Sequence, residues 1–340
     1  MTVRMKDIAE KMGVSLMTVS KALRNHGDVA EETRRRVLKC ARELRYEPNL
    51  VARSLAHGRS YLVGMVVPDL MHSFFAEVAK GVETVLEPRG YQIVMSNSGE
   101  SAERELRQIR LLLSRKVDGL IIASAATSFR ESPLELLQAH SAKYVLIDRS
   151  IPRAKFNFVG VKDEEIAICA ADHLIQQGCR RIAHIAGPGN PTGIGRLRGF
   201  RRAMAKRGLP LPEEYIVRAG HDHAHGYAAM QKLLQVSPRV DGVFCYNDDV
   251  ASGALNAILQ AGLSVPRDIA VIGVGDVHYS DQLRVPLSTI NQRSMSIGEM
   301  AAELLLNCIE AKKTPPLKSI FLEPQLVARE STQRVIPDSE

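Results

Sequence analysis

Residues 6–25 have the sequence KDIAEKMGVSLMTVSKALRN, and this stretch decides the fold of the amino-terminal part of the chain. Its apolar residues recur at the spacing of two short amphipathic helices, with Gly13 at the junction. Glycine tolerates the left-handed backbone of a tight turn, and the hydroxyl of Ser15 can cap the helix that follows. The small Ala9 lets the first helix lie close to the second, and Val19 fills the joint. The stretch therefore predicts a helix–turn–helix.

The second of these helices would present one side to solvent. Helical spacing places Leu16, Met17 and Lys21 on that side, near the start of the helix, where a recognition helix meets base edges in DNA. Thr18 and Ser20 lie beside them and can bind phosphates. The pattern Ala-x-x-x-Gly is also found in ordinary helical hairpins, so by itself it leaves a structural hairpin open as an alternative.

The residues that follow complete a small helical unit and begin a linker. Val37 and Ala41 belong to a third set of apolar residues at helical spacing. Pro48 prevents this third helix from continuing, because proline has no amide hydrogen to donate. Residues 49–57 form a short amphipathic piece that Gly58 ends. We interpret this piece as the linker.

The charge of the chain is concentrated in this first segment. Residues 1–60 contain 13 Lys and Arg against 7 Asp and Glu, a net of +6, whereas the whole chain has a net charge of +7. A basic stretch is often only a solvated helix face. An excess confined to one compact unit nevertheless favours nucleic acid over a membrane as its partner.

From Tyr61 onward, apolar strands alternate with helical stretches, which is typical of a mostly parallel sheet covered by helices. We expect strands at Leu62–Val67, Tyr91–Ser96, Gly119–Ala123, Tyr144–Ile147, Phe158–Val161, Arg181–Ile185, Gly242–Tyr246 and Ile269–Gly273. We expect helices at Phe74–Leu86, Glu103–Ser114, Glu165–Gln177, Arg196–Arg207 and Val250–Ala261. The segments KVDGLIIAS (116–124) and RVDGVFCYND (239–248) each place Val-Asp-Gly before a strand, which favours two similar lobes. Such lobes bind ligands in the cleft at the carboxyl ends of their strands.

Composition excludes several classes of protein. The 340 residues are 45% hydrophobic and contain no run of about 18 apolar residues that could span a bilayer. The polar start, MTVRMKDIAEKMG, does not have the form of a signal peptide, so we expect a cytoplasmic protein without a membrane partner. The 5 cysteines are scattered and show no Cys-x-x-Cys spacing, which argues against a disulfide frame or a thiolate metal site. We expect no metal and no cofactor.

The same residues carry a resemblance to a known family. VSLMTVSK (14–21) and YEPNLVARSL (46–55) resemble the DNA-binding headpiece and hinge of the lactose-repressor family, which includes the purine and catabolite-control repressors. Further motifs follow in the order of that family: YLVGMVVPD (61–69), VLIDRS (145–150), GRLRGF (195–200) and VPRDIAVIGVGD (265–276). The resemblance therefore covers the chain to near its end.

The resemblance implies a role for each matching position of the headpiece and hinge. It makes Leu16, Met17 and Lys21 the residues that read bases in the major groove. Lys21 replaces the commoner arginine, and lysine is a point charge rather than a planar fork. Leu55 becomes the apolar wedge that enters the minor groove at the centre of the operator. The other DNA-binding residues that it implies are Thr18, Ser20, Asn25, Asn49, Ala52 and Arg53.

The remainder of the chain resembles periplasmic sugar-binding proteins, whose clefts hold polar ligands. The matching motifs imply that a small effector contacts Asp148, Arg149, Arg196, Asn247, Asp248 and Gln292. Phe74 or Phe75 would supply an apolar wall. The family usually has Gly-aromatic-Asp after a late strand, whereas this chain has GVGD at 273–276. The pocket aspartate is therefore either displaced to Asp276 or missing.

A histidine cluster stands where the family commonly has an aromatic residue that stacks on the effector. The segment GHDHAHGY (220–227) contains His221, His223 and His225. Alternating histidines are able to bind a metal, to contact an anionic or hydroxylated ligand, or to lie on the surface without a function. The lack of a cysteine partner and the expected loop setting argue against the metal. We include His221 among the effector-binding residues.

The expected architecture is a small all-α helix-turn-helix headpiece joined to a two-lobed α/β sensor that resembles periplasmic-binding proteins, with two doubly wound parallel sheets. We expect the headpiece at residues 1–47, the hinge at 48–60 and the sensor at 61–340, with one lobe near 61–161 and 292–322 and the other near 162–291 and 323–340.

The expected function is that of a homodimeric, sequence-specific transcriptional repressor that binds a palindromic operator and is controlled by a small, carbohydrate-like effector. A corepressor-dependent regulator and one controlled by a partner protein remain as alternatives. The chain has no paired carboxylates, nucleophile motif or phosphate-binding glycine loop at convincing spacing, which argues against an enzyme.

Overall fold

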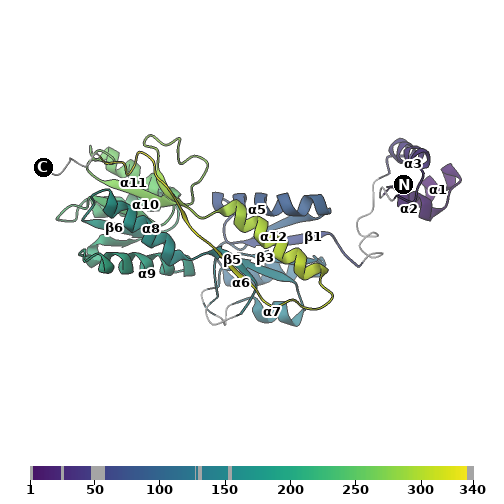
Figure 1. Cartoon of the computed structure of the whole chain (residues 1–340), viewed down its shortest axis with the longest axis horizontal. Coiled ribbons are helices and arrows are strands. Elements are labelled where there is room, and N and C mark those ends of the chain that lie inside the picture. Colours follow the sequence, from purple (N-terminus) through teal and green to yellow (C-terminus); the bar gives the residue numbers. More distant parts are fainter. Residues whose placement is uncertain are drawn as a thin grey trace. The chain divides into compact units, whose positions relative to one another are not determined.

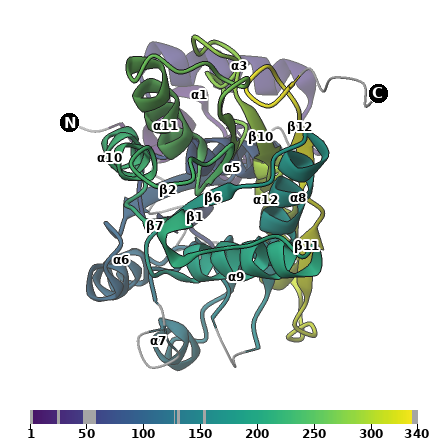
Figure 2. The same ribbon diagram turned by 90° about the vertical axis from the view of Figure 1, so that its left-hand side faces the viewer.

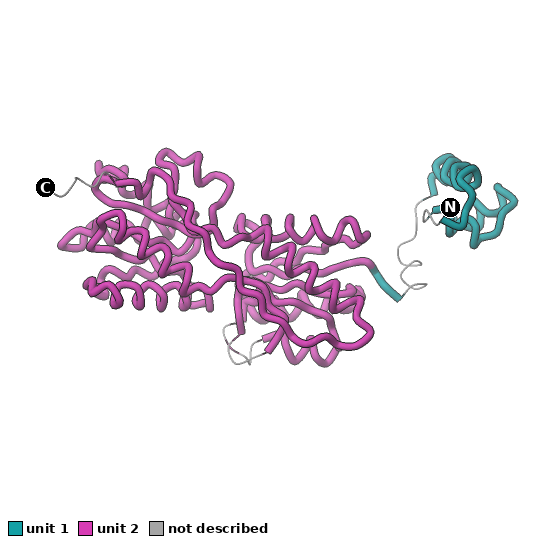
Figure 3. The backbone as a smooth tube through the Cα atoms, viewed as in Figure 1, with its two compact units in different colours: residues 1–60 teal, residues 61–340 magenta. Residues whose placement is uncertain are grey.

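The chain divides into two compact units, Met1–Ser60 and Tyr61–Glu340 (Figure 3). A computed structural model describes residues 3–23, 27–46, 58–126, 128, 132–151 and 155–334. Among the helices of these residues, none combines the length and the hydropathy that a bilayer crossing requires.

The first unit contains the helices α1 (Met5–Met12), α2 (Leu16–Leu23) and α3 (Glu31–Glu43). Their apolar faces meet in one core, formed by Ile8, Ala9, Val19, Ala22, Val29, Val37, Cys40 and Ala41. Gly13 ends α1 in the left-handed conformation, with a φ of 65°. The amide of Thr18 donates a 3.0 Å hydrogen bond to the hydroxyl of Ser15. The expected turn and cap are therefore confirmed.

The second unit contains two six-stranded sheets. The first has the order β11-β5-β4-β3-β1-β2 and is formed by β1 (Leu62–Val67), β2 (Gln92–Asn97), β3 (Gly119–Ile122), β4 (Tyr144–Ile147), β5 (Phe158–Val161) and β11 (Ser319–Leu322). The second has the order β12-β10-β9-β8-β6-β7 and is formed by β6 (Ile182–Ala186), β7 (Ile216–Arg218), β8 (Gly242–Cys245), β9 (Ala270–Val274), β10 (Ser288–Asn291) and β12 (Gln325–Val327). The antiparallel pair β10–β12 departs from the parallel pairing of the other strands.

Helices cover both faces of each sheet (Figures 1 and 2). The first sheet lies between α5 (Ser73–Leu86) with α12 (Ser294–Glu310) and α6 (Ala102–Ser114) with α7 (Leu134–Ala139). The second lies between α8 (Asp163–Gln176) with α9 (Pro191–Lys206) and α10 (His223–Leu233) with α11 (Asp248–Gln260). Short 3₁₀ turns occur at Glu87–Arg89 and Glu213–Tyr215. We call the two sheets with their helices the first and the second lobe.

The chain passes between the lobes after β5, after β10 and after β11 (Figure 1). After β10 it returns to the first lobe as α12, which packs against α5. A methyl group on Gly81 of α5 would lie 2.1 Å from the carbonyl oxygen of Met295, and one on Gly298 would lie 2.1 Å from that of Val78. The two helices therefore approach backbone to backbone, which glycine alone permits. This contact fastens the returning segment to the first lobe.

The expected fold class is confirmed, and each of the eight expected strands lies within one residue of its expected bounds. The start of α9 differs, because this helix begins at Pro191 rather than at Arg196. Asn190 accepts a hydrogen bond from the amide of Gly193 and caps the helix, and proline suits its first position. The sequence did not predict β7, β10, β11 and β12, nor α7, α10 and α12.

Candidate functional site

The candidate DNA-reading surface is the solvent side of α2. Leu16 and Met17 are 51% and 68% exposed, although both side chains are apolar. Val19 of the same helix is fully buried, so the core of the unit is built without the exposed pair. Lys21 lies beside them, with its ammonium 3.1 Å from the carboxylate of Asp28. The surface thus combines apolar side chains with one cation.

The other residues expected to bind DNA are placed in part. Thr18 and Ser20 are half-buried, and the Thr18 hydroxyl lies 2.9 Å from that of Ser15. The remaining residues lie outside those that the structure describes: Asn25, Asn49, Ala52, Arg53 and Leu55. On α3, the exposed side chains of Arg35, Arg36, Lys39 and Arg42 add to the positive charge of the unit.

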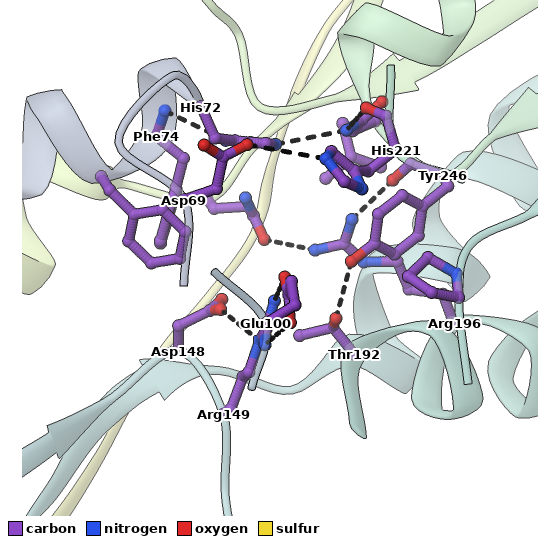
Figure 4. Close-up of a pocket in the computed structure, with 15 residues that line it drawn as sticks. Asp69, His72, Phe74, Glu100, Asp148, Arg149, Thr192, Arg196, His221 and Tyr246 are labelled. Carbon is purple, nitrogen blue, oxygen red and sulfur yellow. Dashed lines mark hydrogen bonds and ion pairs between the residues drawn. The ribbon is translucent and has the colours of Figure 1, made fainter. Parts of the chain in front are cut away.

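The candidate effector site is a pocket in the second unit (Figure 4). Its lining residues follow the carboxyl ends of strands in both sheets, which is where open α/β sheets bind ligands. The space between its lining residues is about 490 Å³ with the open mouth included. The structure brings together eight of the residues expected there: Phe74, Phe75, Asp148, Arg149, Arg196, His221, Asn247 and Gln292. The other lining residues are Asp69, His72, Glu100, Pro188, Thr192, Tyr246 and Val274.

Arg149, which follows β4, forms a buried ion pair on one side of the pocket. Its two terminal nitrogens donate to the two carboxylate oxygens of Glu100 at 2.6 and 2.7 Å. Its Nε lies 3.5 Å from the carboxylate of Asp148. Burial alone would raise the pKa of Glu100, but the bonds from Arg149 hold that pKa below its ordinary value. Both members of the forked pair are therefore charged at neutral pH.

Arg196, in α9, is held by groups of the second lobe and of the crossing segment that follows β10. Its Nε donates to Asp163 at 3.0 Å, and its terminal nitrogens donate to the carbonyl oxygen of Tyr246 at 2.5 Å and to the side-chain oxygen of Gln292 at 2.6 Å. Its guanidinium carbon also lies 4.9 Å from the centre of the Tyr246 ring. Burial raises the pKa of Asp163 to about 7, although Arg196 opposes the shift. The guanidinium is thus fixed in place.

Two histidines take part in contacts between the lobes. Nε2 of His221 lies 3.5 Å from the carboxylate of Asp69. The side-chain nitrogen of Asn247 donates to the carbonyl oxygen of His221 at 2.8 Å and lies 3.2 Å from Nε2 of His72. Burial lowers the pKa of His72, so this ring is neutral at pH 7. Asp69 and His72 belong to the first lobe and the other two residues to the second, so these contacts connect the lobes across the pocket.

Asp248 was expected to contact the effector, but the structure places it outside the pocket. Asn247 caps α11, and Asp248, the first residue of that helix, points into the second lobe. Its carboxylate accepts hydrogen bonds from the hydroxyls of Thr289 and Ser280 at 2.6 and 2.9 Å. Burial raises its pKa to about 6. Asp248 therefore braces the strands behind the pocket.

Asp276, the other expected carboxylate, is also absent from the pocket lining. One of its oxygens lies 2.7 Å from the guanidinium of Arg329, and the other accepts a 2.8 Å hydrogen bond from Asn291. Both partners belong to segments near the crossings between the lobes. The displaced aspartate therefore ties these segments together and does not replace a ligand contact.

The histidine cluster separates in the structure. His221 lines the pocket, whereas His223 and His225 lie in the first turn of α10 and not in a loop as expected. Asp222 caps this helix by accepting a hydrogen bond from the amide of His225, whose ring lies 2.7 Å from the same carboxylate. His223 lies 2.9 Å from the hydroxyl of Ser252. No group of three or more histidine, cysteine or acidic side chains suited to a metal occurs within the described residues.

Sequence reasoning missed several residues of the pocket, among them Asp69, His72, Glu100, Thr192 and Tyr246. Asp69 and Glu100 follow the carboxyl ends of β1 and β2 by two and three residues. Polar residues at the ends of parallel strands were the signal that would have found them. The hydroxyls of Thr192 and Tyr246 lie 2.9 Å apart. These residues are far apart in the sequence, so no local pattern predicts this contact.

Comparison with known protein families identifies both units. Residues 4–49 match the model "Bacterial regulatory proteins, lacI family", and residues 171–332 match "Periplasmic binding protein-like domain". The HTH-type transcriptional repressor PurR of Escherichia coli O1:K1 is 34% identical to the chain over 329 residues, which cover 96% of each protein.

Solved structures resemble the whole chain as well. A Lac repressor dimer bound to operator and the anti-inducer ONPF is 26% identical, with a TM-score of 0.86 over 98% of this chain and 100% of that one. A LacI-family transcriptional regulator from Silicibacter pomeroyi is 30% identical, with a TM-score of 0.80 over 98% and 100%. A complex of the transcriptional regulator CelR with cellobiose is 30% identical, with a TM-score of 0.72 over 97% and 99%.

Proposed function

The chain belongs to the LacI family of bacterial regulatory proteins, and we propose that it represses transcription as a homodimer whose operator affinity depends on a small polar effector. Its helix-turn-helix unit is the DNA-binding part, and its two-lobed unit is the sensor. We assign residues 1–47 to the headpiece, 48–60 to the hinge and 61–340 to the sensor, and we place the protein in the cytoplasm.

The exposed side of α2 supports the DNA-binding assignment. Leu16 and Met17 are exposed to solvent, so these two side chains add little to the hydrophobic core of the first unit. In the major groove the same side chains pack against base edges and thymine methyl groups. Lys21 adds a cation next to them, and its pair with Asp28 is exposed enough to exchange for a base or phosphate contact.

The hinge completes the DNA contact in this proposal. Asn49, Ala52 and Arg53 contact the operator next to the minor groove, and Leu55 enters it as a wedge. A dimer with twofold symmetry matches an operator with the same symmetry, which fixes one hinge piece from each subunit at the operator centre.

The observation that carries the sensor assignment is that both lobes line one pocket. Its walls come from segments after β1, β2 and β4 of the first lobe and after β6, β7 and β8 of the second. The pair His221–Asp69 and the contact of Asn247 with His72 already span the gap. A ligand that joins these contacts changes the free energy of lobe closure and thereby shifts the population of closed protein.

The coupling to DNA follows from this shift. A change in the angle between the lobes alters the spacing of the two hinge pieces in the dimer. Couplings of this kind are typically about 1–3 kcal/mol, which corresponds to a factor of roughly 5–150 in operator affinity.

A two-step experiment tests the proposal. Selection of binding sites from random DNA with the full-length protein is expected to recover a palindrome, and a thermal-shift screen of sugars and related polar metabolites is expected to find a stabilising compound. A compound at about 100 times its Kd adds roughly 2.7 kcal/mol of stability. Operator titrations with and without that compound then give the sign of the response and separate an inducer from a corepressor. Recovery of no preferred sequence would refute the proposal.

A further inference from the structure

Both guanidinium groups of the pocket are already bound by carboxylates of the chain. The two terminal nitrogens of Arg149 are occupied by the two oxygens of Glu100 at 2.6 and 2.7 Å. Arg196 donates to Asp163 at 3.0 Å and to Gln292 at 2.6 Å. Arginine recognises a carboxylate or phosphate ligand by presenting a free fork of N–H donors. In this pocket acceptors of the chain itself already bind one hydrogen on each terminal nitrogen of both groups.

The formal charge of the lining residues also disfavours an anion. Three carboxylates and two guanidinium groups give a sum of −1: Asp69, Glu100, Asp148, Arg149 and Arg196. This sum leaves out Asp163, whose ionisation would make it more negative. His72 contributes no charge at neutral pH because burial lowers its pKa. A proton on His221 would bring the sum only to zero. An entering anion therefore meets no net attraction at close range, where charges are poorly screened.

An unusual backbone conformation positions two of the pocket carboxylates, those of Glu100 and Asp148. Glu100 and Asp148 adopt φ values of 56° and 61°, in the left-handed region that residues other than glycine rarely occupy. Each follows a strand of the first sheet, so the strand ends hold both carboxylates toward the same pocket (Figure 4). Backbone of this kind persists only where the surrounding structure enforces it.

The hydrogen-bonding groups match a ligand that donates. The carboxylate oxygens of Asp69 and Asp148 accept hydrogen bonds and have none to give. Gln292 uses its oxygen for Arg196, so its side-chain nitrogen can donate to the oxygen of a ligand hydroxyl, a group that both donates and accepts. Phe74 and Phe75 form an apolar wall, with ring centres 5.1 Å apart in an edge-to-face pair. Hydroxyl or amide N–H groups of an uncharged ligand can donate to the carboxylates of Asp69 and Asp148. The carbon skeleton of the same ligand can pack on the rings of Phe74 and Phe75.

We propose that this pocket selects an uncharged ligand rich in hydroxyl or N–H donors and rejects the carboxylate and phosphate derivatives of the same skeleton, with Glu100 as the residue that enforces the selection. The proposal rests on the proposed function, in which this pocket is the effector site. It deepens that function by stating the charge of the effector.

Inorganic phosphate is the first probe, because it tests the charge preference without knowledge of the effector. Calorimetric titration of the full-length protein at pH 7.5 and constant ionic strength is expected to show no phosphate binding. Glu100→Gln keeps the length of the side chain and one acceptor for Arg149. It removes the negative charge that compensates the guanidinium of Arg149. This variant is expected to bind phosphate at least tenfold more tightly than the natural protein. The double variant Glu100→Gln/Arg149→Met is expected to lose this gain in phosphate affinity.

Two further variants make the result specific. Glu103→Gln removes the same charge from a side chain that is 81% exposed and paired with Arg107 outside the pocket, so it is expected to leave phosphate binding unchanged. Asp69→Asn removes a pocket charge without breaking the buried pair and is expected to strengthen phosphate binding as well. It keeps the test available if circular dichroism shows that Glu100→Gln does not fold.

Matched ligands form the second arm: D-glucose with gluconate and glucose 6-phosphate, and adenosine with AMP. Any uncharged parent that binds is expected to bind at least tenfold more tightly than its anionic derivative. Phosphate binding by the natural protein that Arg149→Met abolishes overturns the inference, and so does tighter binding of an anionic derivative than of its parent. A folded Glu100→Gln or Asp69→Asn protein that gains no phosphate affinity also overturns it. Failure of the proposed function shows itself separately, as the absence of sequence preference in the DNA selection.

Discussion

Replacing Arg196 by methionine removes the cation that neutralises Asp163 behind the pocket. The two side chains are 5% and 16% exposed, so solvent screens neither charge well. Breaking a buried pair by removing one partner typically costs about 3–5 kcal/mol, because the remaining charge is left uncompensated. The substituted side chain also gives up its hydrogen bonds to Tyr246 and Gln292.

The cost of Arg196→Met depends on pH in a direction that the structure fixes. Burial already raises the folded-state pKa of Asp163 to about 7, so its contribution to stability is present below its unfolded pKa and is lost as the pH rises through about 7. Without Arg196 the folded pKa rises further, and the penalty grows by about 1.4 kcal/mol per unit of that rise. We expect a loss of about 1–3 kcal/mol at pH 5.5, where the carboxyl group is neutral in both proteins, and about 3–5 kcal/mol at pH 8.5.

Urea unfolding followed by far-ultraviolet circular dichroism measures both losses, since the chain contains no tryptophan for fluorescence. Arg201→Met is the matched control, because Arg201 lies on the same helix in an ion pair with Glu213 whose side chains are 48% and 82% exposed. Its loss is expected to stay within about 0.5 kcal/mol at both pH values. A loss for Arg196→Met that equals this control, or that is the same at pH 5.5 and 8.5, would refute the reasoning.

The other predictions concern DNA binding and packing. Met17→Ala or Lys21→Ala is expected to change the preferred operator in a binding-site selection, at a cost of about 1–3 kcal/mol for a good base contact, and an unchanged preference would contradict the proposed docking of α2. Leu55→Ala is expected to weaken operator binding strongly in gel-shift titrations while the protein stays dimeric in ultracentrifugation and still binds DNA nonspecifically. Gly81→Ala is expected to lower the free energy of unfolding by about 1–3 kcal/mol because its methyl group meets a backbone oxygen at 2.1 Å. Gly189→Ala, with no atom within 4 Å of the added methyl group, is its control and should change stability much less.

The sequence predicted the strands well because each is a short apolar run bounded by turns, and buried parallel strands have that form. It predicted the pocket less well where two adjacent residues point in different directions. Asn247 and Asp248 are adjacent polar residues after β8, and the motif gives no reason to separate them. The cap of α11 separates them, because the capping side chain stays at the strand end while the next residue turns into the lobe.

Two other parts of the structure depend on contacts between distant residues. Glu100 gains its role from Arg149, 49 residues later, and only the sheet order brings the ends of β2 and β4 to one pocket. The helix α10 lacks a clear apolar period and contains Gly226, which lowers helix propensity. A methyl group on Gly226 would lie 2.0 Å from the carbonyl oxygen of Val250, so close packing against α11 explains this glycine. Neither relation is visible in a local pattern.

The central claim is that the pocket between the lobes and the operator-binding surface share one conformational equilibrium. Thermodynamic linkage requires a saturating effector to change operator affinity by the same factor by which operator DNA changes effector affinity. The most direct test is therefore a pair of titrations on the same dimer: operator Kd with and without the compound found in the screen, and compound Kd with and without operator. We predict equal factors of roughly 5–150 in the two titrations. A compound that binds in the pocket but changes operator Kd by less than twofold would contradict the account.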